Sequence, residues 1–352
     1  IQAWHYAAPN YPYTCYDVLY RTPRQHVGGC LWHSFDHQRG YHPDPFYGGL
    51  MDVFRQPKYS YYMFQAQRSP KKQDRLFETG PMVYIAHEMT PFSPKDVTVY
   101  SNCDEVRLTY NKGGKSLTYT KPVSREGMPS PIITFKDVYN FMIDKNMSMK
   151  EGRQKEVFLL AEGLINGKVV ATHKVCPARR PSKLLLWIDN ENTELKADGS
   201  DFVTVIAAIA DKNGNIKRLN NYYVKFHIEG EGRILGGANV LANPAPVKWG
   251  TAPILVQSTL KPGKIKITAS VLFEGSQMPV SAELELESKP SAYPLIYASE
   301  EAALIPMKSD SQSFPITAKS QKELEKEKAV KEQNERKLKE VEQQQADFGE
   351  KK

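Results

Sequence analysis

Residues 28–41, GGCLWHSFDHQRGY, bring together side chains that a sugar-binding site can use. Trp32 follows the apolar run GGCL, so we expect its indole at the carboxyl end of a short buried strand. A flat aromatic face in that place can pack against the C–H bonds of a sugar ring. One interpretation therefore makes Trp32 one wall of a carbohydrate site.

Four polar side chains follow this indole closely: His33, Asp36, His37 and Arg39. They can donate and accept hydrogen bonds, so they could bind sugar hydroxyl groups around the aromatic face. The alternative is that the indole only fills a core and the polar residues form a solvated loop. Composition alone does not separate these two interpretations.

The histidines of the same stretch also raise the question of a zinc site. His33, His37 and His42 lie near Asp36 in the sequence. Their spacing matches neither the HExxH nor the CxxC pattern, whose ligands are held on one element. We therefore expect no metal and no other cofactor.

The length, composition and net charge of the chain are ordinary for a globular protein. The 352 residues are enough for two or three domains, with 40% hydrophobic and 25% charged residues. The net charge of +7 comes from 47 basic and 40 acidic residues spread along the chain, so no nucleic-acid partner is expected. No apolar run is long enough for a membrane span. The 4 cysteines form no CxxC pair, and we expect them to be buried as small apolar residues.

The first 78 residues carry an α/β pattern. Helical spacing in YTCYDVLY is followed by the strand-like HVGGCLW, a long polar loop, and a second helical run, PKYSYYMFQAQ, opened by Pro57. The chemistry-bearing side chains then lie at the carboxyl end of the strand, where α/β folds place their sites. Residues 1–78 alone would be poorly packed, or they would lie against the unit that follows.

The middle of the chain has the alternating sequence pattern of β-strands. Short alternating runs such as DVTVYSN and PIITFKDV, with turns such as INGK, predict one immunoglobulin-like sandwich over 79–180. Runs such as DFVTVIAAIAD and KIKITASVLF predict a second over 181–288. The segment CPARRPSK marks the boundary between them.

The end of the chain differs from both sandwiches. Residues 289–319 are rich in Pro and Ser and are expected to form a linker. Residues 320–352 are nearly all helix-forming and charged, which predicts a solvated helical tail rather than a coiled coil. If that tail drove assembly, the sandwiches would act as spacers.

Two motifs carry a family resemblance. The run YRTPRQHVGGCLWHSFDHQRGY, followed by YGGLMDVFRQPKYSYYMFQAQR, resembles the end of the catalytic (β/α)8 barrel of glycoside hydrolase family 2, closest to its β-galactosidase branch. The pattern G-G-x-x-W-x-x-x-D is matched by Gly28, Gly29, Trp32 and Asp36. The pattern G-L-x-x-x-x-R-x-P-K is matched by Gly49, Leu50, Arg55, Pro57 and Lys58. The two sandwiches resemble immunoglobulin-like domains that members append to the barrel, except that NKGGK replaces the usual apolar strand ending in N-G.

The resemblance implies a retaining exo-β-glycosidase, most simply a β-galactosidase acting on terminal β-linked sugars of oligo- or polysaccharides. Its two catalytic glutamates would lie on barrel strands before Ile1, and the chain has no glutamate before Glu78. We therefore expect a C-terminal fragment that holds the last barrel strand and helices, no catalytic residue, and no activity alone. Asp36 would hydrogen-bond at the edge of the site.

The resemblance also implies a carbohydrate substrate and a bacterial enzyme exported to the periplasm or the cell exterior, with a homo-oligomer as a possible assembly. A non-catalytic β-sandwich protein that binds polysaccharide or a partner surface is the alternative. Residues 28–58 discriminate between the two, since a pure binding module has no reason to carry the barrel motifs.

Overall fold

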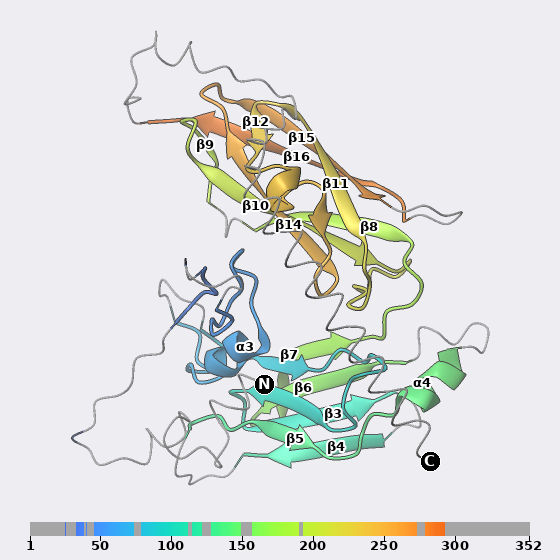
Figure 1. Cartoon of the computed structure of the whole chain (residues 1–352). Helices are drawn as coiled ribbons and strands as arrows, with labels where there is room; N and C mark the ends of the chain where they lie inside the picture. The colour runs from blue at the N-terminus through green and yellow to red at the C-terminus, as the bar shows by residue number, and fades with distance from the viewer. Residues whose placement is uncertain are drawn as a thin grey trace, which may run out of the picture.

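The fold is mainly β, as the sequence predicted, and consists of two pairs of facing sheets with a short helix beside the first pair (Figure 1). The computed structural model describes residues 25, 33–38, 40, 46–73, 79–111, 115–121, 128–148, 157–189, 193–272 and 279–292. The expected first helix, the expected barrel strand with Trp32, Arg39, and the charged tail lie outside the described residues.

The first pair of sheets spans residues 83–175. Its strands are β1 (Val83–Ala86), β2 (Val97–Ser101), β3 (Glu105–Tyr110), β4 (Lys115–Thr120), β5 (Ile133–Phe135), β6 (Leu159–Ile165) and β7 (Lys168–Val175). One sheet has the order β1-β2-β5 and the other β4-β3-β6-β7, and all pairs are antiparallel. Alternate side chains such as Val97, Val99, Val106 and Leu108 fill the core between them.

The second pair of sheets spans residues 183–290. Its strands are β8 (Lys183–Asp189), β9 (Lys196–Ala197), β10 (Phe202–Ala210), β11 (Tyr223–Gly230), β12 (Gly232–Ile234), β13 (Ala245–Pro246), β14 (Thr251–Ser258), β15 (Gly263–Leu272) and β16 (Ala282–Pro290). The sheets have the orders β12-β14-β10-β8 and β13-β11-β15-β16-β9. Strand β16 continues to Pro290, two residues beyond the expected end of the unit at 288, because it pairs in parallel with β9.

The predicted strands follow from period-two alternation. In β14 every second residue is buried, and the same pattern continues in β15. The predicted INGK turn joins β6 to β7, with Asn166 and Gly167 both at positive φ, as a two-residue hairpin turn requires. The segment CPARRPSK runs between β7 and β8 without strand structure until Lys183. The domain boundaries themselves stay predictions.

Helix α4 (Phe141–Ser148) was not predicted, because its apolar residues do not recur at helical spacing. A local signal was present in Asn140. Its side-chain oxygen accepts hydrogen bonds from the backbone N–H groups of Met142 (3.0 Å) and Ile143 (3.3 Å). This is the arrangement of an N-cap, which satisfies donors that the helix itself leaves free. The short strands β9, β12 and β13 were also missed.

Helix α3 (Tyr59–Gln65), which the sequence predicted, lies against the outer face of the β1-β2-β5 sheet. Met63 is buried beside Tyr100 of β2, and the ring of Tyr62 stacks on Tyr84 of β1 at 3.6 Å. Gln67 extends this contact by accepting a hydrogen bond from the backbone N–H of Ser130 (3.0 Å). The described residues of α3, within the segment 1–78, thus pack on the first pair of sheets, as one of the two sequence expectations has it.

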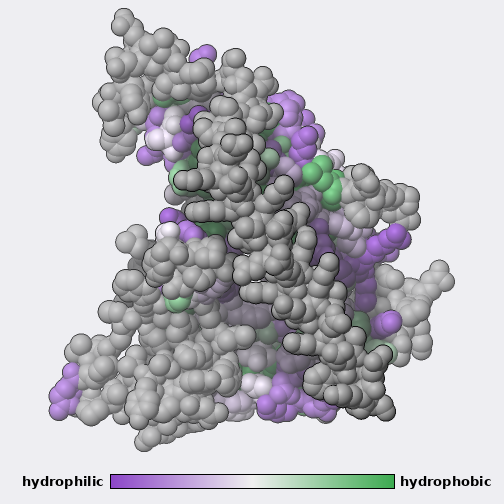
Figure 2. All heavy atoms as spheres, in the orientation of Figure 1, coloured by the Kyte–Doolittle hydropathy of each residue, from purple (hydrophilic) through white to green (hydrophobic). Residues whose placement is uncertain are grey.

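None of the helices within the described ranges combines the length and the apolar composition that crossing a membrane requires. On the face seen in Figure 2, the described residues are mostly hydrophilic, with small hydrophobic areas between them. Cys103 is buried and Cys176 half-buried, and both are free thiols, which agrees with the expected packing role of these two cysteines.

A buried histidine makes the stability of the first pair of sheets depend on pH. His87 is 3% exposed; its Nδ1 accepts from the Met89 N–H, so its Nε2 donates to the Pro94 carbonyl. Burial lowers the pKa of His87 below its ordinary 6.5. Because the folded-state pKa is depressed, this contribution is complete above about pH 6.5 and is lost as pH falls toward the folded-state pKa.

We expect the temperature of the thermal unfolding midpoint to decrease when the pH is lowered from 7 to 5. The substitution His87→Gln should make this decrease smaller. His227→Gln is the matched control, because the His227 side chain is 69% exposed. Calorimetry at several pH values measures both. A pH dependence unchanged by His87→Gln would contradict the assignment.

Candidate functional site

The residues predicted for the site lie on a loop that is paired with the second motif. The N–H of Asp36 donates to the Met51 carbonyl (2.9 Å), and the N–H of Met51 donates to the Ser34 carbonyl (3.0 Å). His37 and Phe46 form a two-way backbone pair beside them. The loop after the predicted barrel strand is therefore held by the segment that carries Gly49 to Lys58.

Asp36 is the buried centre of this pairing, with an exposed fraction of 6%. Its Oδ1 accepts from the Gly49 N–H (2.9 Å) and from Lys58 Nζ (2.6 Å). Lys58 also donates to the carbonyl of Tyr47 (3.2 Å). A carboxylate removed from water needs such donors, and a charged donor gives the stronger hydrogen bond. The final residues of the two sequence motifs thus form one ion pair.

Gly49 is required at this point because the backbones approach too closely for a side chain. A Cβ placed on Gly49 would lie 2.3 Å from the nitrogen of Asp36 and 2.6 Å from the carbonyl oxygen of Met51. Both atoms belong to the backbone, so neither can move aside as a flexible side chain could. The glycine of the second motif is explained by this contact.

The remaining residues of the second motif shape the turn before α3. Asp52 Oδ1 accepts from the N–H groups of Phe54 (2.8 Å) and Gln56 (2.9 Å). Arg55 lies in this turn at φ 65°, and its guanidinium lies 5.0 Å from the centre of the Phe35 ring. Burial raises the pKa of Asp52. The turn delivers Lys58, whose N–H donates to the carbonyl of Leu50 (3.0 Å).

The two described histidines of the site lie edge to face. The ring centres of His33 and His37 are 4.3 Å apart, and Phe46 lies 5.1 Å from His33. Loss of solvent contact lowers the pKa of His33, and the neighbouring His37 lowers it further. Imidazole rings packed beside a phenyl ring can line an aromatic wall, and their nitrogen atoms are hydrogen-bonding groups.

The structure therefore brings three predicted site residues, His33, Asp36 and His37, onto one loop. Trp32 and Arg39 lie outside the described residues, so the sugar-binding role of all five stays a prediction. Asp36 is engaged inward, with Lys58. The sequence identified Lys58 only as a motif residue and not as the partner of Asp36, although two motifs on consecutive elements were a signal that their residues meet.

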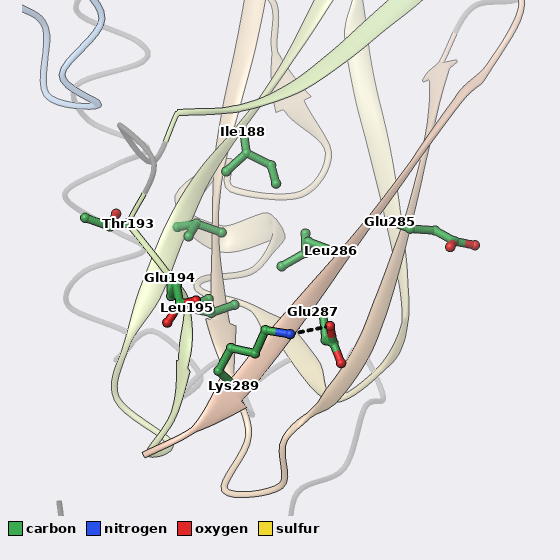
Figure 3. A pocket seen from close by; sticks show the side chains of 9 residues that line it. Ile188, Thr193, Glu194, Leu195, Glu285, Leu286, Glu287 and Lys289 are labelled. Atoms are coloured by element: carbon green, nitrogen blue, oxygen red, sulfur yellow. Dashed lines mark hydrogen bonds and ion pairs between the residues drawn. The ribbon is translucent and has the colours of Figure 1, made fainter. Parts of the chain in front are cut away.

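No metal site is evident in the described ranges, since they hold no group of three or more His, Cys, Asp or Glu side chains arranged around one point. A separate pocket of about 360 Å³ lies in the second pair of sheets (Figure 3). Ile188 and Leu286 point into it, and at its rim Lys289 pairs with Glu287 (2.7 Å). Among the described residues that line it there is no aromatic ring, so this part of the pocket lacks the flat face expected of a sugar site.

Comparisons with known proteins find one family match in the second half of the chain and several similar proteins. Residues 186–272 match the family described as glycoside hydrolase family 2 C-terminal domain 5. The chain is 32% identical over 273 residues to a protein of Thermoanaerobacter pseudethanolicus named Beta-galactosidase, covering 75% of this chain and 34% of that protein. It is 28% identical over 261 residues to Beta-galactosidase BoGH2A of Bacteroides ovatus, covering 69% of this chain and 27% of that protein.

A solved structure shares the fold. The crystal structure of a β-glycosidase from Bacteroides vulgatus superposes with a TM-score of 0.52 at 23% identity, over 73% of this chain and 30% of that one. This likeness concerns the fold alone. The chain spans about a third or less of the length of the curated relatives it matches, 34% and 27% in the two named above.

The close approach at Gly49 predicts the effect of one methyl group. Gly49→Ala should disrupt the pairing of the loop and speed hydrogen exchange at the amides of Asp36 and Met51 by more than ten-fold, as a local cost above about 1.4 kcal/mol implies. Gly40→Ala is the control, since no atom of the described residues lies within 4 Å of a Cβ there. Equal exchange in the two variants would show that the approach does not constrain the loop.

Proposed function

We propose, from its confirmed resemblance to the C-terminal part of glycoside hydrolase family 2 proteins, that this chain is the C-terminal part of a retaining exo-β-glycosidase. The substrates are terminal β-linked sugars of oligo- or polysaccharides, and β-galactosides come first among them. Two curated relatives are named as β-galactosidases, which supports this choice of sugar.

The Asp36–Lys58 ion pair is the observation that carries the proposal. Asp36 ends the first motif and Lys58 ends the second, 22 residues apart, and the two join at 2.6 Å. Motif residues that merely coincided by chance would have no reason to meet. Their contact fixes the loop that follows Trp32, which is where a barrel of this kind presents its substrate-binding groups.

In the whole protein, two glutamates about 5–5.5 Å apart would act as nucleophile and acid/base. The present chain would contribute the rim of the sugar site: Trp32 as the platform, with His33, Asp36, His37 and Arg39 around it. The chain alone, without that carboxyl pair, would not hydrolyse glycosides. Export to the periplasm or cell exterior, and the division into a barrel end and two immunoglobulin-like units, belong to the same proposal.

Activity measurements on aryl β-glycosides test this function. A protein that contains the complete barrel together with this chain should hydrolyse 4-nitrophenyl β-D-galactoside and retain the anomeric configuration, whereas the chain alone should not. The β-glucuronide and β-mannoside distinguish the glycone. If the complete protein cleaved none of these yet bound polysaccharide, the non-catalytic binding function would replace the proposal.

The platform role of Trp32 has its own test in that complete protein. Trp32→Ala should lower kcat/KM by at least about ten-fold, equivalent to about 1.4 kcal/mol of transition-state binding. Trp249→Ala is the control, because the Trp249 side chain is exposed in the turn before β14 and alanine keeps the backbone carbonyl that Arg218 contacts. Unchanged kinetics in Trp32→Ala would show that this residue only fills a core.

A further inference from the structure

Glu88 joins three parts of the chain that are far apart in sequence. Its Oε1 accepts from the hydroxyl of Tyr59, the first residue of α3 (2.9 Å), and its Oε2 accepts from Arg218 Nε (2.9 Å). Glu88 follows β1 in the first pair of sheets, whereas Arg218 precedes β11 in the second. A single carboxylate therefore ties the helix after the barrel motif to both pairs of sheets.

The ion pair between Glu88 and Arg218 is partly buried, so water screens it less than a surface pair. The side chains of Glu88 and Arg218 are 17% and 26% exposed, and Arg218 also donates to the carbonyl of Trp249 (3.2 Å). Burial raises the pKa of Tyr59, with the neighbouring Glu88 as the next cause. A buried hydroxyl without an acceptor costs free energy, so Tyr59 depends on Glu88, and Glu88 on its two donors.

A second contact reaches the same segment from the second pair of sheets. Gln56 Nε2 donates to Asp189 Oδ2 at the end of β8 (2.7 Å). The backbone N–H of Gln56 is bound in turn by Asp52. The second pair of sheets thus contacts the short segment from Gln56 to Tyr59 directly at Gln56, and through Glu88 at Tyr59. Figure 1 shows α3 beside the first pair of sheets, on the side that faces the second.

We propose that Arg218 and Glu88 are positioning residues, through which the second pair of sheets fixes the loop of the candidate site. The route is short and continuous. Arg218 holds Glu88, Glu88 holds Tyr59, and Tyr59 is covalently next to Lys58, whose ammonium group holds Asp36. The second pair of sheets, which matches the family's C-terminal domain, would then help to order the proposed sugar site.

The ordering of the loop by Arg218 and Glu88 can be measured without any enzymatic activity. Only its expected effect on catalysis rests on the proposed function. Removing the Arg218 guanidinium leaves Glu88 with one donor fewer, so its carboxylate can turn toward water and release Tyr59. The turn from Gln56 to Lys58 then loses an anchor, and the Asp36–Lys58 pair opens more often. Local opening of this kind is read directly by amide hydrogen exchange.

The test is hydrogen exchange by mass spectrometry on the whole chain. Arg218→Met should raise exchange at the amides of Asp36, Gly49 and Met51 by about ten-fold, as loss of a charged hydrogen bond implies. Arg233→Met is the matched control. Arg233 is an exposed arginine of the second pair of sheets that donates to Gln257 (2.7 Å), so its loss should leave those amides unchanged. An equal rise of exchange in β10 and β15 would show a general loss of stability and would contradict a route that acts locally on the loop.

Tyr59→Phe tests whether the coupling runs through the hydroxyl, since it removes only that group. If coupling runs through Glu88, Arg218→Met should add little to the exchange already raised by Tyr59→Phe. Independent, multiplying effects of the two changes would overturn the route, and so would unchanged exchange in Arg218→Met.

In the complete enzyme, Arg218→Met should lower kcat/KM several-fold while Arg233→Met does not. An inactive enzyme would challenge the proposed function without altering the exchange result.

Discussion

The burial of one carboxylate organises the candidate site. Asp36 is removed from water, so it must find donors, and it finds them in Lys58 and the backbone of Gly49. Both donors come from the segment that follows the loop, and the chain must double back closely to supply them. That close return leaves no room for a side chain at Gly49. Breaking such a pair from one side leaves an unpaired buried charge, which is why its two partners belong together.

Local pattern was enough to predict most of the strands, because period-two alternation decides which face of a strand is buried. It was also enough for α3 and for the turn at Gly167. Helix α4 was not predicted because its sequence signal is the N-cap residue Asn140 and not a periodic pattern of apolar residues. Contacts between distant positions could not be predicted from spacing. The partner of Asp36 lies 22 residues away, and Arg218 lies 130 residues from Glu88. The role of Trp32 and Arg39 stays a prediction.

The architecture suggests what the two pairs of sheets contribute to the segment that precedes them. A short helix and a polar turn bury little apolar surface by themselves, so their geometry depends on what they pack against. Here α3 packs on tyrosine rings of the first pair of sheets, and its Tyr59 donates to Glu88 of that pair. Gln56, in the turn before the helix, donates to Asp189 of the second pair. We therefore interpret the β-structure as support for the proposed sugar site, which holds the loop after Trp32 in place through Lys58.

The candidate site depends most directly on the energetic coupling between Asp36 and Lys58, and a double-mutant cycle measures it. The free energy of local opening, taken from exchange of the Gly49 amide, would be compared in Asp36→Asn, Lys58→Met and the double variant. We expect the double variant to lose less stability than the sum of the single ones, by about 1 kcal/mol or more. Additivity within about 0.3–0.5 kcal/mol would contradict this dependence, because the two motifs would then meet without holding each other.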